Sequence, residues 1–347
     1  MKSPSETLRK AKRAPRPGTG GITLSDVASL AGVSAITVSR ALNTPAAVSP
    51  ETLERVRSAI SRSGYVPNLV AGGLASNRSR LVAALVPTIA GPVFLETIQA
   101  LTDALAEAGC QLILGQSGYS GAREDALIDA IVGRRPDGIV LTGIMHSPEG
   151  RRRLLASGIP IVETWDITPT PIDMIVGFSH EKVGAAVADY LYGQGFRRPG
   201  VVIAEDQRAL RRRAGFEARL SELGVHGIPV CTVPAPSSLA NGRAGFADLR
   251  ARHPDIDVVF CGSDVIAHGV ITEAQALGLS IPGDVAVMGF GDLPFAAFTH
   301  PSLSTVRIDG TSIGRQAARF ILDVAENRDV GARVRDLGFL IVKRASA

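Results

Sequence analysis

The chain has 347 residues, of which 45% are hydrophobic and 5% aromatic, and its formal net charge is +4. This length fits two or three domains, and the composition is that of a soluble α/β protein. No apolar run reaches the roughly 18 residues of a membrane-spanning helix. Three scattered cysteines, Cys110, Cys231 and Cys261, exclude a disulfide framework and a cysteine metal site.

The positive charge is concentrated at the N-terminus. Residues 1–80 contain 12 Lys and Arg against four Asp and Glu, a balance of +8, so the remaining 267 residues carry −4. A basic segment on a mildly acidic body is typical of a polyanion-binding module fused to another domain. Residues 1–21 have the composition of a disordered basic tail. They hold no apolar signal segment, so we expect a cytoplasmic protein.

The next segment predicts two short helices joined by a tight turn. In the first helix, which starts at Ser25, one face carries Val27, Ala28 and Ala31. The turn is "AGVS", where Gly32 suits a left-handed helix end and Ser34 suits the N-cap of the second helix. In that second helix we expect Val38 and Leu42 to face inward.

A third helix is predicted at "SPET", with Ser49 as the N-cap and Pro50 at the first helical position. Its apolar stripe consists of Leu53, Val56 and Ile60. Three helices this short can share one small core and leave the second partly exposed. This is the geometry of a helix-turn-helix domain, in which the exposed helix enters the major groove of DNA. An ordinary helical cap on a larger domain is the alternative at this point.

Two segments together resemble a known family. "DVASLAGVSAITVSRALN" is similar to the helix-turn-helix of the LacI/GalR family of transcriptional repressors, and "GYVPNLVAGGLASNRS" to its hinge. The resemblance extends over essentially the whole chain after the tail. It implies a DNA-binding domain at 22–66, a hinge at 67–80, and an effector-binding and dimerisation domain at 81–347. The expected partners are double-stranded operator DNA, a small effector and a second copy of the chain.

The resemblance also assigns roles in DNA recognition. It places Ala35, Ile36 and Arg40 at base-reading positions, where Arg40 can contact guanine and the two apolar residues can sense shape or thymine methyls. Phosphate contacts and register are expected from Ser34, Thr37, Ser39 and Asn43. Leu74 of the hinge would wedge into the minor groove. Gly72 and Gly73, a departure from the family, would each cost the hinge helix about 1 kcal/mol. A simple flexible linker remains the alternative for these two glycines.

From Leu81 onward, short apolar runs that predict buried parallel strands alternate with helical stripes. One such helix is expected from Phe94 to Ala108, with an inner face of Leu95, Ile98, Leu101 and Leu105. The pattern restarts after "DMIVGF", which predicts two doubly wound α/β lobes with a cleft at the carboxyl ends of their strands. The resemblance implies a type I periplasmic-binding-protein-like fold. Lobe 1 is expected at about 81–178 and 308–335, and lobe 2 at about 179–307 and 336–347.

Motifs for catalysis are incomplete in this body. "HEKVG" lacks the second histidine of a zinc helix, and "GQSGY" lacks the final glycine of a nucleophile elbow. Asp292 after "GFG" leaves no dinucleotide fingerprint. We therefore expect binding without turnover, and neither a metal nor a cofactor.

Candidate effector-binding residues follow from strand ends and from the resemblance: Thr88, Phe94, Glu163, Arg212, Ser263 and Asp264. Arg212 matches the family's cleft arginine. Its neighbours Arg211 and Arg213 are expected on the solvated surface, because three successive helical residues cannot face one cleft. Three alternatives stay open: Asp264 as helix cap or ligand contact, Phe94 as cleft wall or core, and Trp165 as stacking or structural residue.

Two departures from the family favour an anionic ligand. Gly291 stands where many members that bind neutral sugars carry an acid, and His180 where many have Asn. Losing a carboxylate while keeping Arg212 favours a ligand carboxylate, which an arginine can bind in bidentate fashion. Segments such as "GPVFLETIQAL" and "PIDMIVGF" resemble the gluconate-operon repressor branch. We expect a sugar acid such as gluconate. The alternatives are a regulator responding to a neutral sugar, a solute-binding receptor and a sugar-acid enzyme.

Overall fold

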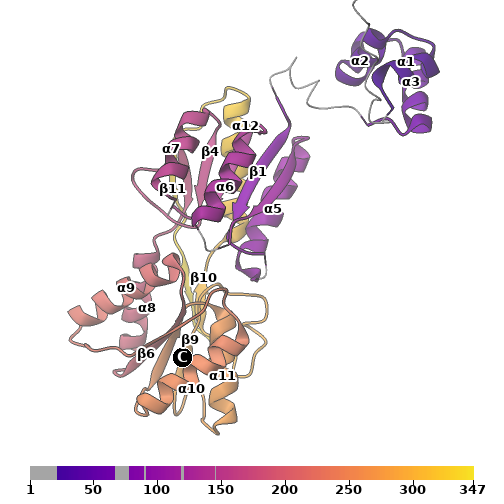
Figure 1. The fold of residues 1–347 in the computed structure, drawn as a ribbon. Helices are drawn as coiled ribbons and strands as arrows, with labels where there is room; N and C mark the ends of the chain where they lie inside the picture. Colours follow the sequence, from indigo (N-terminus) through magenta and orange to yellow (C-terminus); the bar gives the residue numbers. More distant parts are fainter. Residues whose placement is uncertain (1–21, 67–77, 90, 119–120, 145) are drawn as a thin grey trace, which may run out of the picture. The chain divides into compact units, whose positions relative to one another are not determined.

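The computed structural model describes residues 22–66, 78–89, 91–118, 121–144 and 146–347. These form two compact units, divided between Ser79 and Arg80. Figure 1 shows the chain coloured from indigo at the N-terminus to yellow at the C-terminus.

The N-terminal unit is a bundle of three helices, α1 (Leu24–Ala31), α2 (Ala35–Asn43) and α3 (Pro50–Ser63), with a 3-10 turn at Pro45–Ala47. The expected caps are confirmed. Gly32 ends α1 with a φ of 64°, and the Ser34 hydroxyl accepts from the backbone N–H of Thr37. Ser49 caps α3 in the same way.

The side chains at the centre of this bundle's core are smaller than those predicted. Alanines occupy it together with three valines: Val27, Ala28, Ala31, Val38, Ala41, Val56 and Ala59 are buried. The expected inward residues Leu42, Leu53 and Ile60 pack around this centre and stay only partly buried. Helices this close together leave room for a methyl group at the crossing, so the larger side chains are displaced to the rim.

Lobe 1 of the second unit contains a six-stranded sheet in the order β11-β5-β4-β3-β1-β2, parallel throughout. Its strands are β1 (Leu81–Val86), β2 (Gln111–Gln116), β3 (Gly138–Thr142), β4 (Ile161–Thr164), β5 (Met174–Gly177) and β11 (Val334–Asp336). Its helices are α5 (Leu95–Glu107), α6 (Gly121–Val132), α7 (Pro148–Ser157) and α12 (Gly310–Ala325), with a 3-10 turn at Pro92–Phe94.

Both faces of this sheet are covered. Val82 and Ala84 of β1 belong to the cluster that includes α5 and α12, whereas Ala83 and Leu85 pack with α6 and α7. This alternation is the reason that β1 reads as a continuous apolar run. In α5 the buried stripe runs through Thr97, Leu101 and Leu105 at four-residue spacing. The prediction of Leu95 on the inner face was therefore wrong, and its side chain is 47% exposed.

Lobe 2 contains a four-stranded parallel sheet in the order β7-β6-β8-β9. Its strands are β6 (Pro199–Ala204), β7 (Val230–Val233), β8 (Val258–Cys261) and β9 (Ala286–Met288). Its helices are α8 (His180–Gly193), α9 (Gln207–Glu222), α10 (Leu239–Arg252) and α11 (Asp264–Ala276), of which α8 packs on α9 and α10 on α11.

Glycines bring α8 and α9 into backbone contact. A Cβ at Gly184 would lie 1.9 Å from the carbonyl oxygen of Arg212, and one at Gly215 would lie 2.1 Å from that of Glu181. No side chain fits at either position, so both helices are held at one spacing and one register. Because Gly184 of α8 packs against the backbone of Arg212, this contact fixes the position of Arg212 along α8, near the N-terminus of that helix.

Three segments connect the lobes. The chain leaves lobe 1 between β5 and α8, returns from β10 (Thr305–Arg307) to α12, and leaves again from β11 to β12 (Leu340–Val342). β10 and β12 pair with each other in antiparallel fashion. Figure 1 shows α12, drawn in yellow, beside the helices and strands of lobe 1 although it comes late in the sequence. The predicted fold, two doubly wound α/β lobes behind a helix-turn-helix head, is confirmed. Within the described residues, no helix combines the length and hydropathy needed to cross a bilayer.

Candidate functional sites

The outer face of α2 is the candidate DNA-binding surface. Val38 and Ala41 turn into the core, which leaves Ile36, Arg40 and Asn43 exposed. Ile36 is 66% exposed, and an exposed aliphatic side chain is able to contact a thymine methyl in the major groove. None of the ion pairs found among the described residues involves Arg40, so its guanidinium is available to a base or a phosphate.

The polar residues of this face form short hydrogen-bonded pairs. Ser34 Oγ lies 2.9 Å from Thr37 Oγ1, and Asn43 Nδ2 donates to the carbonyl oxygen of Ser39 at 3.0 Å. These bonds orient the side chains along one edge of α2, where phosphate contacts set the register of a recognition helix. Ala35 lies beside them, half-buried. Leu74, Gly72 and Gly73 lie outside the described residues.

Between the lobes lies a cavity of about 70 Å³. Its walls come from segments that follow strands of both sheets: Thr88 and residues 91–94 after β1, Trp165 after β4, Asp206, Arg208 and Arg212 after β6, Gly262, Ser263 and Val265 after β8, and Phe290 and Leu293 after β9. Carboxyl ends of parallel strands are where α/β folds bind ligands. Of the sequence-predicted residues, Thr88, Phe94, Arg212 and Ser263 line this cavity.

Arg212 is buried in the wall with its guanidinium fixed. Nη2 donates to the carbonyl oxygen of Gly262 at 2.7 Å, Nη1 donates to His180 Nδ1 at 3.0 Å, and the group stacks 3.8 Å above the Phe290 ring. Burial lowers the pKa of Arg212 to about 10, so the side chain remains cationic at neutral pH.

His180 is the neutral partner of this arginine. Burial, followed by the charge of Arg212, lowers the pKa of His180 well below its ordinary value. Its Nε2 lies 2.9 Å from the carbonyl oxygen of Trp165, which can only accept. Nε2 therefore carries the proton, and Nδ1 accepts from Arg212.

Trp165 forms a wall of the cavity and is itself held tightly. Its φ is 62°, and its indole Nε1 donates to Thr97 Oγ1 at 3.0 Å. Phe94 packs edge-on against it with ring centroids 5.1 Å apart. Phe94 and Trp165 both belong to the core and to the cavity lining, so both alternatives for Phe94, cleft wall and core, hold. Stacking of a ligand on Trp165 stays a prediction.

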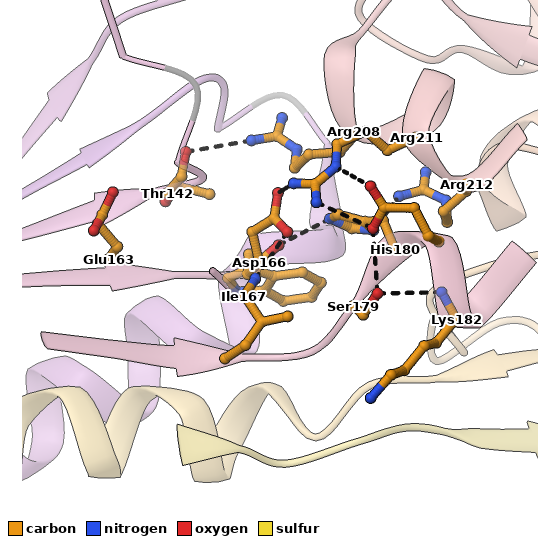
Figure 2. Close-up of polar contacts among 12 residues, drawn as sticks. Thr142, Glu163, Asp166, Ile167, Ser179, His180, Lys182, Arg208, Arg211 and Arg212 are labelled. Carbon is orange, nitrogen blue, oxygen red and sulfur yellow. Dashed lines mark hydrogen bonds and ion pairs between the residues drawn. The ribbon is translucent and has the colours of Figure 1, made fainter. Parts of the chain in front are cut away.

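Arg208 was not among the residues predicted from the sequence, although it lies one helical turn before Arg212 on α9. It lines the cavity, and its Nη1 donates across the cleft to the carbonyl oxygen of Thr142 at 3.3 Å (Figure 2). Asp206, the N-cap of α9, is the carboxylate nearest to it in the wall, with 3.5 Å between the charged groups. The four-residue spacing of Arg208 and Arg212 was the signal that could have identified it.

Arg211 is not on the solvated surface, and that prediction was wrong. Its Nη1 lies 2.5 Å from Asp166 Oδ2 and its Nε 2.6 Å from Glu181 Oε1. Asp166 is fully buried and follows β4 of lobe 1, so this ion pair joins the two lobes (Figure 2). Arg213, as expected, is partly solvated and pairs with Glu217 on its own helix.

Glu163 is placed away from the cavity. Its Oε2 accepts from the backbone N–H of Ile172 at 2.6 Å, and its Oε1 lies 3.5 Å from His146 Nε2. Burial opposes the charge of His146, but the neighbouring carboxylates of Glu124 and Glu163 raise its pKa to about 9. Glu163 lies inside β4, two residues after Ile161, which packs with α6 and α7, so strand alternation turns both side chains to that face of the sheet.

Asp264 is also placed away from the cavity. Ser263, not Asp264, caps α11. The two oxygens of Asp264 accept from Thr305 Oγ1 at 2.5 Å and from the backbone N–H of Leu293 at 2.7 Å. Burial raises its pKa to about 6. Asp264 thus ties the segment after β9 and strand β10 to α11. Asp292 points elsewhere too, toward Arg307 and Arg344.

The comparisons with known proteins agree on both units. A model for bacterial regulatory proteins of the lacI family matches residues 23–68, and one for a periplasmic binding protein-like domain matches residues 188–347. The chain is 39% identical to the HTH-type transcriptional regulator GntR of Pseudomonas aeruginosa, over 94% of this chain and 96% of that protein.

Two solved structures are similar over most of their length. One is a LacI-family transcriptional regulator from Silicibacter pomeroyi, 33% identical, with a TM-score of 0.89 over 94% of this chain and 99% of that one. The other is the transcription regulator GntR from Chromobacterium violaceum, 34% identical, with a TM-score of 0.74 over 77% of this chain and 98% of that one.

Proposed function

The chain belongs to the lacI family of bacterial regulatory proteins and is a DNA-binding transcriptional repressor; on that premise we propose that it controls sugar-acid catabolism, with a sugar acid such as gluconate as its effector. The effector would bind in the cavity between the lobes. The repressor would act in the cytoplasm as a homodimer on a pseudo-palindromic operator, one N-terminal unit to each half-site.

The observation that carries the sugar-acid proposal is the charge of the cavity wall. Its described lining contains two cations, Arg208 and Arg212, and one carboxylate, Asp206. His180 is neutral, and Asp264, Asp292 and Glu163 point elsewhere. The wall therefore carries a formal charge of +1. A neutral sugar would shield these cations from water without balancing the positive charge of the wall. A monocarboxylate carries the one negative charge that balances it.

The walls around these charges suit a polyhydroxy chain. Thr88, Ser237 and Ser263, which carry hydroxyl groups, line the cavity, and Trp165 and Phe290 provide apolar faces. Few polar groups among aromatic walls is the usual composition of a small-molecule site. The resemblance to the gluconate-operon repressor branch supports the same ligand class.

For DNA recognition we propose the roles that the family resemblance implies. Arg40 reads guanine, and Ala35 and Ile36 contact thymine methyls or sense groove shape. The four polar residues Ser34, Thr37, Ser39 and Asn43 contact phosphates. Exposure of the α2 face supports this assignment. Leu74 remains the predicted minor-groove wedge.

Isothermal titration calorimetry tests the effector class. The purified protein should bind gluconate more tightly than glucose, because only gluconate neutralises the wall. Tighter binding of the neutral hexose would refute the sugar-acid proposal and favour a regulator that responds to a neutral sugar. A gel shift on the protein's own promoter region, titrated with gluconate, 2-ketogluconate and related acids, then tests whether the ligand acts on DNA binding.

A further inference from the structure

The two arginines on the cavity wall differ in how the protein holds them. Arg212 is 4% exposed, and its two terminal nitrogens each donate one hydrogen bond, to Gly262 and to His180. The Phe290 ring centroid lies 3.8 Å from the guanidinium carbon, and the buried Nε has no hydrogen-bond partner within the described residues. Arg212 can offer its remaining N–H groups only in this orientation, because turning would break a hydrogen bond in a buried site, which costs about 1–3 kcal/mol.

Arg208 has no comparable set of partners. Its hydrogen bond to the carbonyl oxygen of Thr142 is long, 3.3 Å, and its charged contact with Asp206 is longer, 3.5 Å. The Phe94 ring centroid lies 5.2 Å away, near the outer limit of a cation–π contact. The side chain is nevertheless only 13% exposed. It has lost most of its hydration and gained weak contacts in return, so a carboxylate would improve its environment substantially.

Arg208 borders two spaces. It lines the inner cavity and also a hollow of about 530 Å³ bounded by Thr142, Gly143 and Glu205. A ligand group can therefore approach the side chain of Arg208 from either space. In Figure 2 this side chain reaches from α9 toward lobe 1, while Arg212 points along the helix toward His180.

We propose that Arg208 is the residue that selects a carboxylate ligand. This inference rests on the proposed function and deepens it by assigning charge recognition to a residue. Arg208 exchanges its bond to the Thr142 carbonyl for a bidentate bond to the carboxylate at the outer end of the ligand. Arg212 remains in place and supports the inner wall through His180 and Phe290.

The exchange has a consequence for the two lobes. Thr142 ends β3 of lobe 1 and Arg208 belongs to α9 of lobe 2, so their bond is a direct contact across the cleft. A bound carboxylate replaces that weak contact with one that runs through the ligand. Recognition of charge and the arrangement of the lobes therefore depend on the same side chain, and a neutral analogue would bind without changing this contact.

The test compares two ligands of nearly the same shape, the anion gluconate and the neutral gluconamide, with four full-length proteins. These are the wild type, Arg208→Gln, Arg208→Met and the control Arg213→Gln, whose side chain is on the same helix but pairs with Glu217 outside the cavity. Calorimetry gives the ratio of the two dissociation constants for each protein. Thermal melts and the gluconamide affinity report whether each variant is folded.

The wild type and Arg213→Gln should prefer gluconate on the order of 10- to 100-fold, the worth of one charge-assisted pair. In Arg208→Gln and Arg208→Met the ratio should fall to near one while gluconamide affinity is retained. If the wild type discriminates and both Arg208 variants discriminate equally well, the assignment to Arg208 is overturned and Arg212 is the receptor. If the wild type does not prefer gluconate, the anionic effector itself is refuted, and this inference with it.

Discussion

Asp166 provides a quantitative test of how the lobes are joined. Its carboxylate is fully buried between the Arg211 guanidinium, 2.5 Å away, and the backbone N–H of Ile167, 2.8 Å away. Burial raises its pKa to about 6, and the contacts with Ile167 and Arg211 offset this only in part. In the unfolded chain the pKa would be near 3.8. The folded state therefore binds the Asp166 proton more tightly than the unfolded state does.

The direction of the pH effect follows from this difference. Between about pH 4 and pH 6 the folded protein holds a proton on Asp166 that the unfolded chain has lost, so stability decreases as the pH rises through this window. A difference of roughly two pKa units corresponds to about 3 kcal/mol. Asp166→Asn removes the titrating group. The free energy of unfolding of the variant, relative to that of the wild type, should increase by about 3 kcal/mol from pH 4 to pH 7.

Urea denaturation of both proteins at pH 4, 5, 6, 7 and 8 measures this difference. Comparing the variant with the wild type cancels the contributions of Asp264 and His146, whose pKa values are also raised. A difference that is constant over this range would mean that Asp166 titrates alike in both states. A difference of opposite sign would mean that the ion pair with Arg211 outweighs burial, and either result refutes the reasoning.

Three further predictions concern the two sites. Arg40→Ala should weaken operator binding by about 1–3 kcal/mol and relax the preference at one base pair, as measured by competition gel shifts with single-base variants of the operator. Gly184→Ala places a methyl 1.9 Å from a backbone oxygen of α9, so it should lower both thermal stability and gluconate affinity, whereas Gly193→Ala, with open space around it, should change neither. Glu163→Gln should destabilise the fold by about 1–3 kcal/mol in chemical denaturation because it weakens a buried pair, yet leave gluconate affinity within about twofold of the wild type. A large loss of gluconate affinity in this variant would mean that Glu163 does contribute to effector binding.

The N-terminal unit could be predicted closely because local rules determine it. Gly32, Ser34 and Ser49 act through the backbone of their own turn, which sequence spacing reveals directly. Whether Ala41 or Leu42 lies at the centre of the core depends on the distance between the helices. The spacing of apolar residues in the sequence does not reveal that distance.

The cavity shows where prediction from sequence ends. A strand end marks the edge of a sheet but not the direction of a side chain, so Glu163 and Asp264 were assigned to the cleft and lie instead in buried hydrogen bonds. Arg211 was assigned to the surface because three successive helical residues cannot face one cleft, and sequence spacing does not reveal its partner Asp166, 45 residues away in the other lobe. Arg212 was located through the family resemblance, and Arg208 only through the cavity that it lines.

The central claim is that one chain couples DNA binding to a sugar acid. Fluorescence anisotropy of a labelled operator duplex, with the full-length protein at physiological salt, measures operator affinity with and without saturating gluconate. We predict a sequence-specific complex whose dissociation constant gluconate changes by roughly 5- to 150-fold while glucose leaves it unchanged, with the operator changing gluconate affinity by the same factor. An operator affinity that is identical with and without gluconate, or binding that is equal for all duplex sequences, would contradict the account.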